Sequence, residues 1–105
     1  MERIEEMNLY KLFKFYNKTL FNNQLIKPRI RWFNKKGFDG LFEGESDGEY
    51  IFAQIKINEN AEVHSTLIHE MVHLYQFQFN HNVNHGKSFK AWHRRIKKQM
   101  GINIK

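Results

Sequence analysis

The hydrophobic residues of this chain recur with two spacings, which separate the predicted helices from the predicted strands. In residues 4–21 and 87–100, apolar side chains return every three or four positions, as on a helix with one buried face. In residues 50–57, aliphatic residues alternate with polar or aromatic ones, which is typical of a strand with one buried face. Residues 61–80 combine a broad apolar arc with one polar strip, and we predict a helix buried on most of its circumference.

Two further strands are predicted before residues 50–57. Residues 27–36 alternate basic or aromatic side chains with apolar ones, as in a half-exposed strand. Residues 37–49 contain four glycines and five acidic residues but no basic residue, which predicts a hairpin with an acidic turn near residues 45–48. We therefore expect an α+β fold with an N-terminal helix, a small three-stranded antiparallel sheet, a central helix and a basic C-terminal helix.

The composition favours one globular domain over residues 1–105. A chain of 105 residues with 41% hydrophobic residues can bury a single core, and its one proline argues against disorder. The absence of cysteine excludes disulfides, a thiolate nucleophile and Cys-based zinc sites. No apolar run resembles a signal peptide or is long enough to cross a membrane, so we expect a cytoplasmic protein that does not associate with membranes.

The positive charge of the chain is concentrated in its last helix. The net charge is +6, and residues 87–105 contain seven Lys or Arg and no Asp or Glu. Such a segment favours DNA through contacts with phosphates, although a solvated helix face would have the same composition. The predicted DNA contacts are Lys87, Lys90, Arg94, Arg95, Lys97 and Lys98.

The motif HEMVH at residues 69–73 carries the candidate chemistry. His69 and His73 are four residues apart, so a helix places both imidazoles on one face, at the spacing of two zinc ligands. Glu70 lies beside the pair and can act as a general base on a water molecule without binding the metal. The alternative interpretation is that both histidines face solvent on an ordinary amphipathic helix. Such a helix would have a wide charged face, whereas Glu70 is the only formal charge between residues 62 and 87.

A catalytic zinc ion usually has three protein ligands, so one more must be found. No Asp or Glu follows Glu70, which leaves His81, His85 and His93. His81 is two turns beyond the motif, about 12 Å along a continuing helix and too far for the same ion. His93 borders the apolar stripe of the last helix, where a hydrogen-bonded core histidine is common. His85 is favoured, because it follows a turn and precedes Gly86, which allows a close backbone approach.

These motifs resemble the SprT-like zinc metallopeptidase domain, the group that includes Spartan. The resemblance rests on HEMVH, on HGKSF at residues 85–89 and on LFNNQL at residues 20–25, and it covers residues 5–102. It implies a zincin-like fold, one Zn²⁺ ion and proteolysis of DNA-bound or DNA-crosslinked proteins. It further implies Glu70 as the catalytic residue and, as zinc ligands, His69, His73 and His85.

The sequence therefore predicts a zinc-dependent metalloendopeptidase with a protein or peptide substrate. Many relatives carry a Cys-based zinc ribbon or separate DNA-binding regions, whereas these 105 residues contain no cysteine. DNA recruitment is then expected from the basic last helix, from residues 27–36 or from another protein. The alternative is a non-catalytic nucleic-acid-binding or protein-interaction domain that retains a zinc site.

Overall fold

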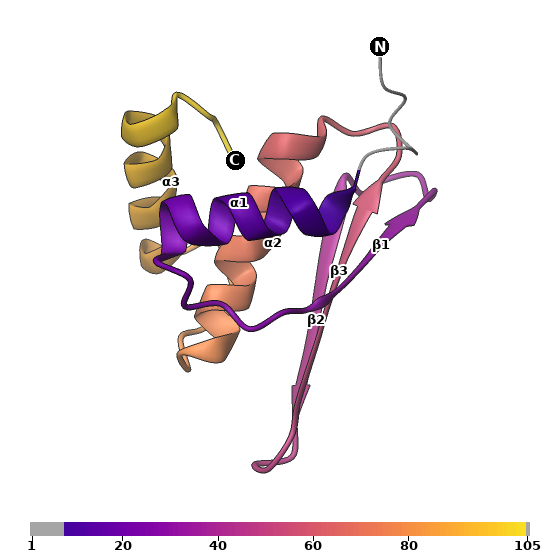
Figure 1. Cartoon of the computed structure of the whole chain (residues 1–105), viewed down its shortest axis with the longest axis vertical. Helices are drawn as coiled ribbons and strands as arrows, with labels where there is room; N and C mark the ends of the chain where they lie inside the picture. The colour runs from indigo at the N-terminus through magenta and orange to yellow at the C-terminus, as the bar shows by residue number, and fades with distance from the viewer. Residues whose placement is uncertain (1–7, 105) are drawn as a thin grey trace.

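The computed structural model describes residues 8–104, which fold into helices packed on one face of a sheet (Figure 1). This arrangement confirms the predicted α+β class. The predicted start of the first helix, residues 4–7, lies outside the described residues. The elements are α1 (Leu9–Phe21), β1 (Arg29–Phe33), β2 (Gly40–Ser46), β3 (Ile51–Asn58), α2 (Val63–Gln78) and α3 (Lys87–Met100).

The sheet is mixed, so the prediction of a purely antiparallel sheet is wrong. The strand order is β1-β3-β2, with β2 antiparallel and β1 parallel to β3. We attribute the difference to hydrophobicity, because β3 contributes Ala53, Ile55 and Ile57 to the core and takes the central position. The β2–β3 hairpin itself was predicted correctly, and Figure 1 shows its tip extending beyond the helices.

Helix α2 is the centre of the core. It contacts β2 and β3 on one side and α1 and α3 on the other. Its Leu67, Ile68, Met71, Val72 and Leu74 side chains are completely buried. Burying each such side chain stabilises the fold by about 1.5–3 kcal/mol. The helix that carries HEMVH is therefore held rigidly by packing on nearly all sides.

Asn58 anchors the loop that crosses from β1 to β2 over the end of β3. Its side chain is 8% exposed, and its Nδ2 donates hydrogen bonds to the carbonyls of Lys35 and Phe38, both at 2.9 Å. Its backbone N–H donates to the Asp39 carbonyl at 2.7 Å. One buried side chain thus fixes the position of residues 35–39.

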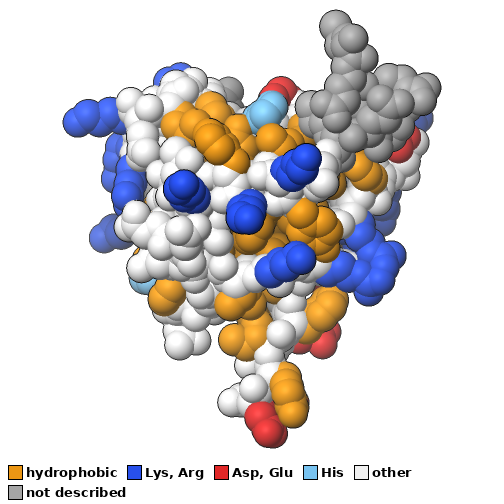
Figure 2. Space-filling model, in the orientation of Figure 1, with side chains coloured by type: hydrophobic (Ala, Val, Ile, Leu, Met, Phe, Trp, Pro, Cys, Tyr) orange, Lys and Arg blue, Asp and Glu red, His pale blue; other side chains and the backbone are white. Residues whose placement is uncertain are grey.

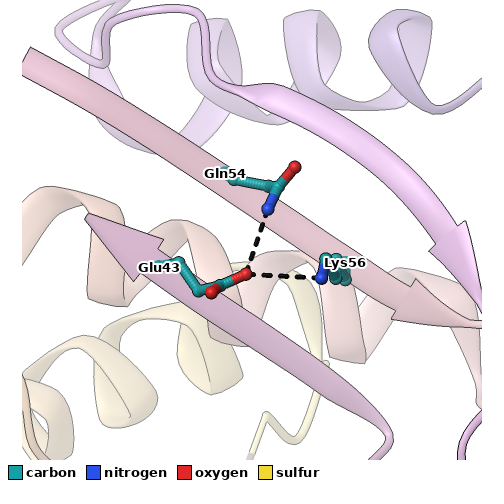
Figure 3. A network of polar contacts seen from close by, with 3 residues as sticks. All are labelled: Glu43, Gln54 and Lys56. Carbon is teal, nitrogen blue, oxygen red and sulfur yellow. Dashed lines mark hydrogen bonds and ion pairs between the residues drawn. The ribbon is translucent and has the colours of Figure 1, made fainter. Parts of the chain in front are cut away.

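The face of the sheet opposite the helices carries polar side chains. Figure 3 shows Glu43 on β2 accepting a hydrogen bond from Gln54 Nε2 at 3.0 Å and pairing with Lys56 Nζ at 3.5 Å. Because the Lys56 and Glu43 side chains are 34% and 48% exposed, this ion pair contributes less than about 1 kcal/mol. The network joins β2 to β3 on the outer face of the sheet.

Within residues 8–104, none of the helices has the length and apolar character needed to span a membrane.

Replacing Asn58 should loosen the crossing loop. We expect Asn58→Ala to lower the free energy of unfolding by about 1–3 kcal/mol, because the Lys35 and Phe38 carbonyls lose their buried donor. Asn34→Ala is the matched control, since it removes only an exposed hydrogen bond to Glu59. Urea denaturation measures both variants, and equal stability of the two would contradict the anchoring role of Asn58.

Candidate metal centre

Three histidines from two parts of the chain converge on one point. Helix α2 places His69 and His73 one turn apart, and their ring centroids are 4.9 Å from each other. The loop between α2 and α3 brings in His85, whose Nε2 lies 3.1 Å from His69 Nε2 and 3.2 Å from His73 Nε2. One ring nitrogen from each histidine lies within 4.8 Å of the other two. The structure thus brings His85, rather than His81 or His93, next to the pair.

Hydrogen bonds on the far side of two rings fix their tautomers. His69 Nδ1 lies 2.5 Å from the Ile104 carbonyl, which can only accept, so this nitrogen carries the proton. His73 Nδ1 lies 2.7 Å from Gln76 Oε1. The amide orientation of Gln76 is set by its Nε2, which donates to the Asn84 carbonyl at 3.0 Å and to Ser88 Oγ at 2.7 Å. The Nε2 atoms of His69 and His73 therefore present lone pairs.

This arrangement fits a zinc ion. Two lone pairs that face the same point repel each other unless a cation or a proton lies between them. A tetrahedral zinc ion with Zn–N bonds of 2.0–2.1 Å separates its ligand nitrogens by about 3.3 Å, close to the spacing of His85 Nε2 from the other two. Burial lowers the pKa of His73 to about 4, which keeps this imidazole neutral and able to bind a metal.

The histidine cluster packs against an aromatic ring on one side and is exposed on another. Phe89 of α3 is 4% exposed, and its ring centroid lies 4.8 Å from His69, 5.3 Å from His73 and 4.8 Å from His85. His73 is buried, His69 is half-buried and His85 is exposed. Within residues 8–104 the cluster has these three members. Three ligands with one open side are typical of catalytic zinc sites, whereas structural sites are closed.

Glu70 lies beside the cluster at the wall of a cleft. It is 5% exposed, and its burial raises the pKa of the carboxyl group to about 8. The cleft has a volume of about 500 Å³ and is bordered by His69, Glu70, the loop residues 37–40 and the segment after α3. A cation at the histidines would lower the pKa of Glu70 again, because opposite charge favours the ionised form.

Gly40, the first residue of β2, brings the sheet directly over Glu70. A Cβ atom at this position would lie 2.8 Å from Glu70 Oε2 and 2.6 Å from Thr66 Cγ2. Any side chain here would displace the carboxylate or the helix. The glycine therefore permits the close approach of β2 to α2 that sets the position of Glu70.

The other histidines described by the structure lie outside the cluster. The Nδ1 atom of His64 is 2.6 Å from the hydroxyl of Tyr16. His81 stacks on Tyr75 with the ring centroids 6.0 Å apart. His93 lies on α3, and its Nε2 atom is 2.5 Å from Asn103 Oδ1.

The predicted DNA contacts all lie on α3 with exposed side chains. Arg95 also covers the ring of Trp92, with its guanidinium carbon 5.0 Å from the centroid. The face that carries these residues is separate from the histidine cluster, which α3 contacts through Phe89.

Three features of the site have no distinguishing signal in the sequence. The Ile104 acceptor is a backbone carbonyl, and any residue type could supply it. Gly40 belongs to a glycine-rich segment whose glycines predict turns, and only the packing of β2 on α2 distinguishes it. Gln76 is one of several amides near the motif, and the sequence does not rank it above the others.

Gln76 should determine how well His73 binds zinc. We expect Gln76→Ala to weaken zinc binding by about 10–100-fold, because loss of the partner of Nδ1 frees the ring and its tautomer. Gln78→Ala on the same helix is the matched control, since Gln78 bonds to Ile26 and Gln24 and not to a histidine. Competition with a chromogenic chelator measures both affinities. Wild-type affinity in Gln76→Ala would contradict this role.

The raised pKa of Glu70 predicts that the free energy of unfolding of the metal-free protein falls as the pH rises. Because folding raises this pKa from 4.5 to about 8, its contribution to stability is fully present below pH 4.5 and is lost as the pH rises through 8. Glu70→Gln removes this loss, so its stability relative to wild type should increase over that range, by up to a few kcal/mol. Urea titrations with chelator at several pH values measure the difference. Glu45→Gln, at an exposed position, is the control for removing a carboxylate. A pH-independent difference between Glu70→Gln and wild type would contradict the burial effect.

The chain matches a known family over nearly its whole described length. The sequence profile of the SprT-like family matches residues 9–105. None of the curated proteins matches the sequence. The SprT-like family is associated with zincin-like metallopeptidases, and the three histidines form a group that could hold a metal ion, as the resemblance predicted. With its HEMVH helix and this match over residues 9–105, the chain belongs to the SprT-like family.

Proposed function

We propose that this protein is a zinc-dependent metalloendopeptidase. The observation that carries the proposal is the combination of three converging imidazole nitrogens with a buried carboxyl group at the adjoining cleft. His69, His73 and His85 would hold one zinc ion, and Glu70 would act as the general base. Family membership supports the same class of reaction.

Each residue has a distinct role in the proposed reaction. Bound zinc would supply Lewis acidity, which polarises the scissile carbonyl and acidifies a water molecule. Glu70 accepts a proton from that water and delivers it to the leaving amine, so one carboxyl group serves as base and then as acid. Burial alone raises the pKa of this carboxyl group, and a bound zinc ion would lower it again, favouring the ionised form that accepts the proton.

The sheet offers a way to hold an extended peptide. Strand β2 lies at the edge of the sheet, and its first residue, Gly40, lies over Glu70. An edge strand presents unpaired backbone groups that can pair with a peptide. The central position of β3 excludes it from this role, because both of its sides are paired. We therefore propose that β2 aligns the substrate along the cleft.

The main alternative is a domain that binds nucleic acid or protein and keeps a purely structural zinc site. Structural sites usually have four ligands and are closed to water. Here the cluster has three members within residues 8–104, and His85 is exposed. A buried carboxyl group with a raised pKa beside the cluster destabilises the metal-free fold at neutral pH, which a structural role does not require. These observations favour catalysis.

Two substitutions separate metal binding from chemistry. Glu70→Gln should retain one zinc ion per chain and lose peptidase activity by at least about 100-fold, because the amide cannot accept the proton. His85→Ala should lose both zinc and activity, because two ligands bind zinc weakly. Metal analysis and cleavage of an unfolded protein substrate test both. Retained cleavage in Glu70→Gln would contradict the mechanism, and unchanged zinc content in His85→Ala would contradict the ligand set.

We propose in addition that the exposed face of α3 binds DNA and brings the peptidase to DNA-bound protein substrates. The supporting observation is charge. The six basic side chains of α3 are exposed, and no acidic residue follows Glu70 in the chain. Figure 2 shows Lys and Arg side chains along the edge of the molecule where α3 lies. Phosphates would be bound by these side chains without reading of the base sequence.

Neutralising one side of α3 should weaken DNA binding. We expect the triple variant Lys90→Gln, Arg94→Gln and Lys97→Gln to bind duplex DNA more weakly and with a smaller salt dependence, by about 0.9 in slope for each lost phosphate contact. The triple variant Lys11→Gln, Lys14→Gln and Lys18→Gln on α1 removes the same charge and serves as control. Fluorescence anisotropy over a salt series measures both. Equal losses in the two variants would show that only net charge matters.

A further inference from the structure

The segment after α3 returns to the metal centre. Gly101 adopts a left-handed conformation with φ of 72° and ends the helix, its N–H donating to the Lys97 carbonyl at 2.8 Å. The chain then passes from α3 toward α2, as Figure 1 shows. Ile104 is only 2% exposed, so its side chain belongs to the core. Asn103 and Ile104 also border the cleft that contains Glu70.

Two short hydrogen bonds connect this segment to histidines on different helices. The Ile104 carbonyl accepts from Nδ1–H of His69 on α2 at 2.5 Å. One residue earlier, Asn103 Oδ1 accepts from Nε2–H of His93 on α3, also at 2.5 Å. The segment is thereby held between α3 and the first histidine of the HEMVH motif.

These two hydrogen bonds connect His93 to the metal centre through adjacent residues. Asn103 and Ile104 are adjacent, so holding the Asn103 side chain restricts the peptide unit whose carbonyl bonds to His69. The Nδ1–H partner of a metal-binding histidine sets both its tautomer and its ring orientation. If the segment moves, the Ile104 carbonyl moves with it, and His69 loses part of the constraint that aims Nε2 at the cluster.

We propose that His93 and Asn103 are positioning residues of the metal centre. They hold residues 101–104 against α3, and the Ile104 carbonyl thereby keeps His69 oriented for zinc. The proposal rests on the proposed zinc site, but it does not depend on peptidase activity. A purely structural role for this bond would instead affect only the stability of the fold.

Zinc affinity of the full chain tests the proposal. We expect His93→Ala and Asn103→Ala each to weaken zinc binding by about 3–10-fold, less than the loss of a direct partner of a ligand. The double variant should be no weaker than either single variant, because both remove the same hydrogen bond. His93→Gln keeps an N–H donor on the side chain and should restore most of the affinity. His81→Ala is the matched control, since His81 is exposed and lies outside this connection.

A second measurement separates positioning from stability. The visible absorption spectrum of the cobalt-substituted protein reports ligand geometry, and we expect it to change in Asn103→Ala and to return toward wild type in His93→Gln. The free energy of unfolding of the metal-free variants is measured alongside. Asn103 is exposed, so its replacement leaves the core intact.

Three results would overturn the proposal. The first is wild-type zinc affinity and cobalt spectrum in both alanine variants. The second is loss of zinc in His93→Ala but not in Asn103→Ala, which would make His93 a ligand. The third is a wild-type protein that binds no zinc, which would overturn the proposed zinc site as well. Zinc binding without peptide cleavage would overturn the peptidase proposal alone.

Discussion

The candidate metal centre depends on holding the Nε2 lone pairs of His69 and His73 toward the same point. In the absence of a cation this arrangement is unfavourable, and it requires partners that hold the rings from behind. Gln76 and the Ile104 carbonyl provide these partners, and Phe89 supports all three rings from α3. The buried packing of α2 supplies the rigid base from which His69 and His73 project. The fold thus holds the three imidazoles in an arrangement that could bind a metal ion.

The sheet forms the other half of the site. Asn58 ties the crossing loop to the end of β3, and this loop leads directly into Gly40 above Glu70. The three histidines are therefore positioned by α2, the α2–α3 loop and the segment after α3, whereas the space around the carboxylate is set by the sheet.

The sequence predicts those parts of the fold and site that depend on residues close together in the chain. Helical spacing placed His69, Glu70 and His73 on one face, and amphipathic periodicity predicted α3 with its observed bounds. The parallel pairing of β1 with β3 depends on which strand is buried deepest, and that is settled by contacts between distant residues. The hydrogen bond between His69 and the Ile104 carbonyl could not be predicted for another reason, because every residue type has a backbone carbonyl.

The coordination of zinc in the loaded protein is the most direct test of the proposed three-histidine site. X-ray absorption spectroscopy at the zinc edge counts the ligand atoms and distinguishes imidazole from other donors. We expect three imidazole nitrogens and one further oxygen at about 2.0–2.1 Å, as in an open tetrahedral site. Four imidazoles, or a shell made only of oxygen atoms, would contradict it.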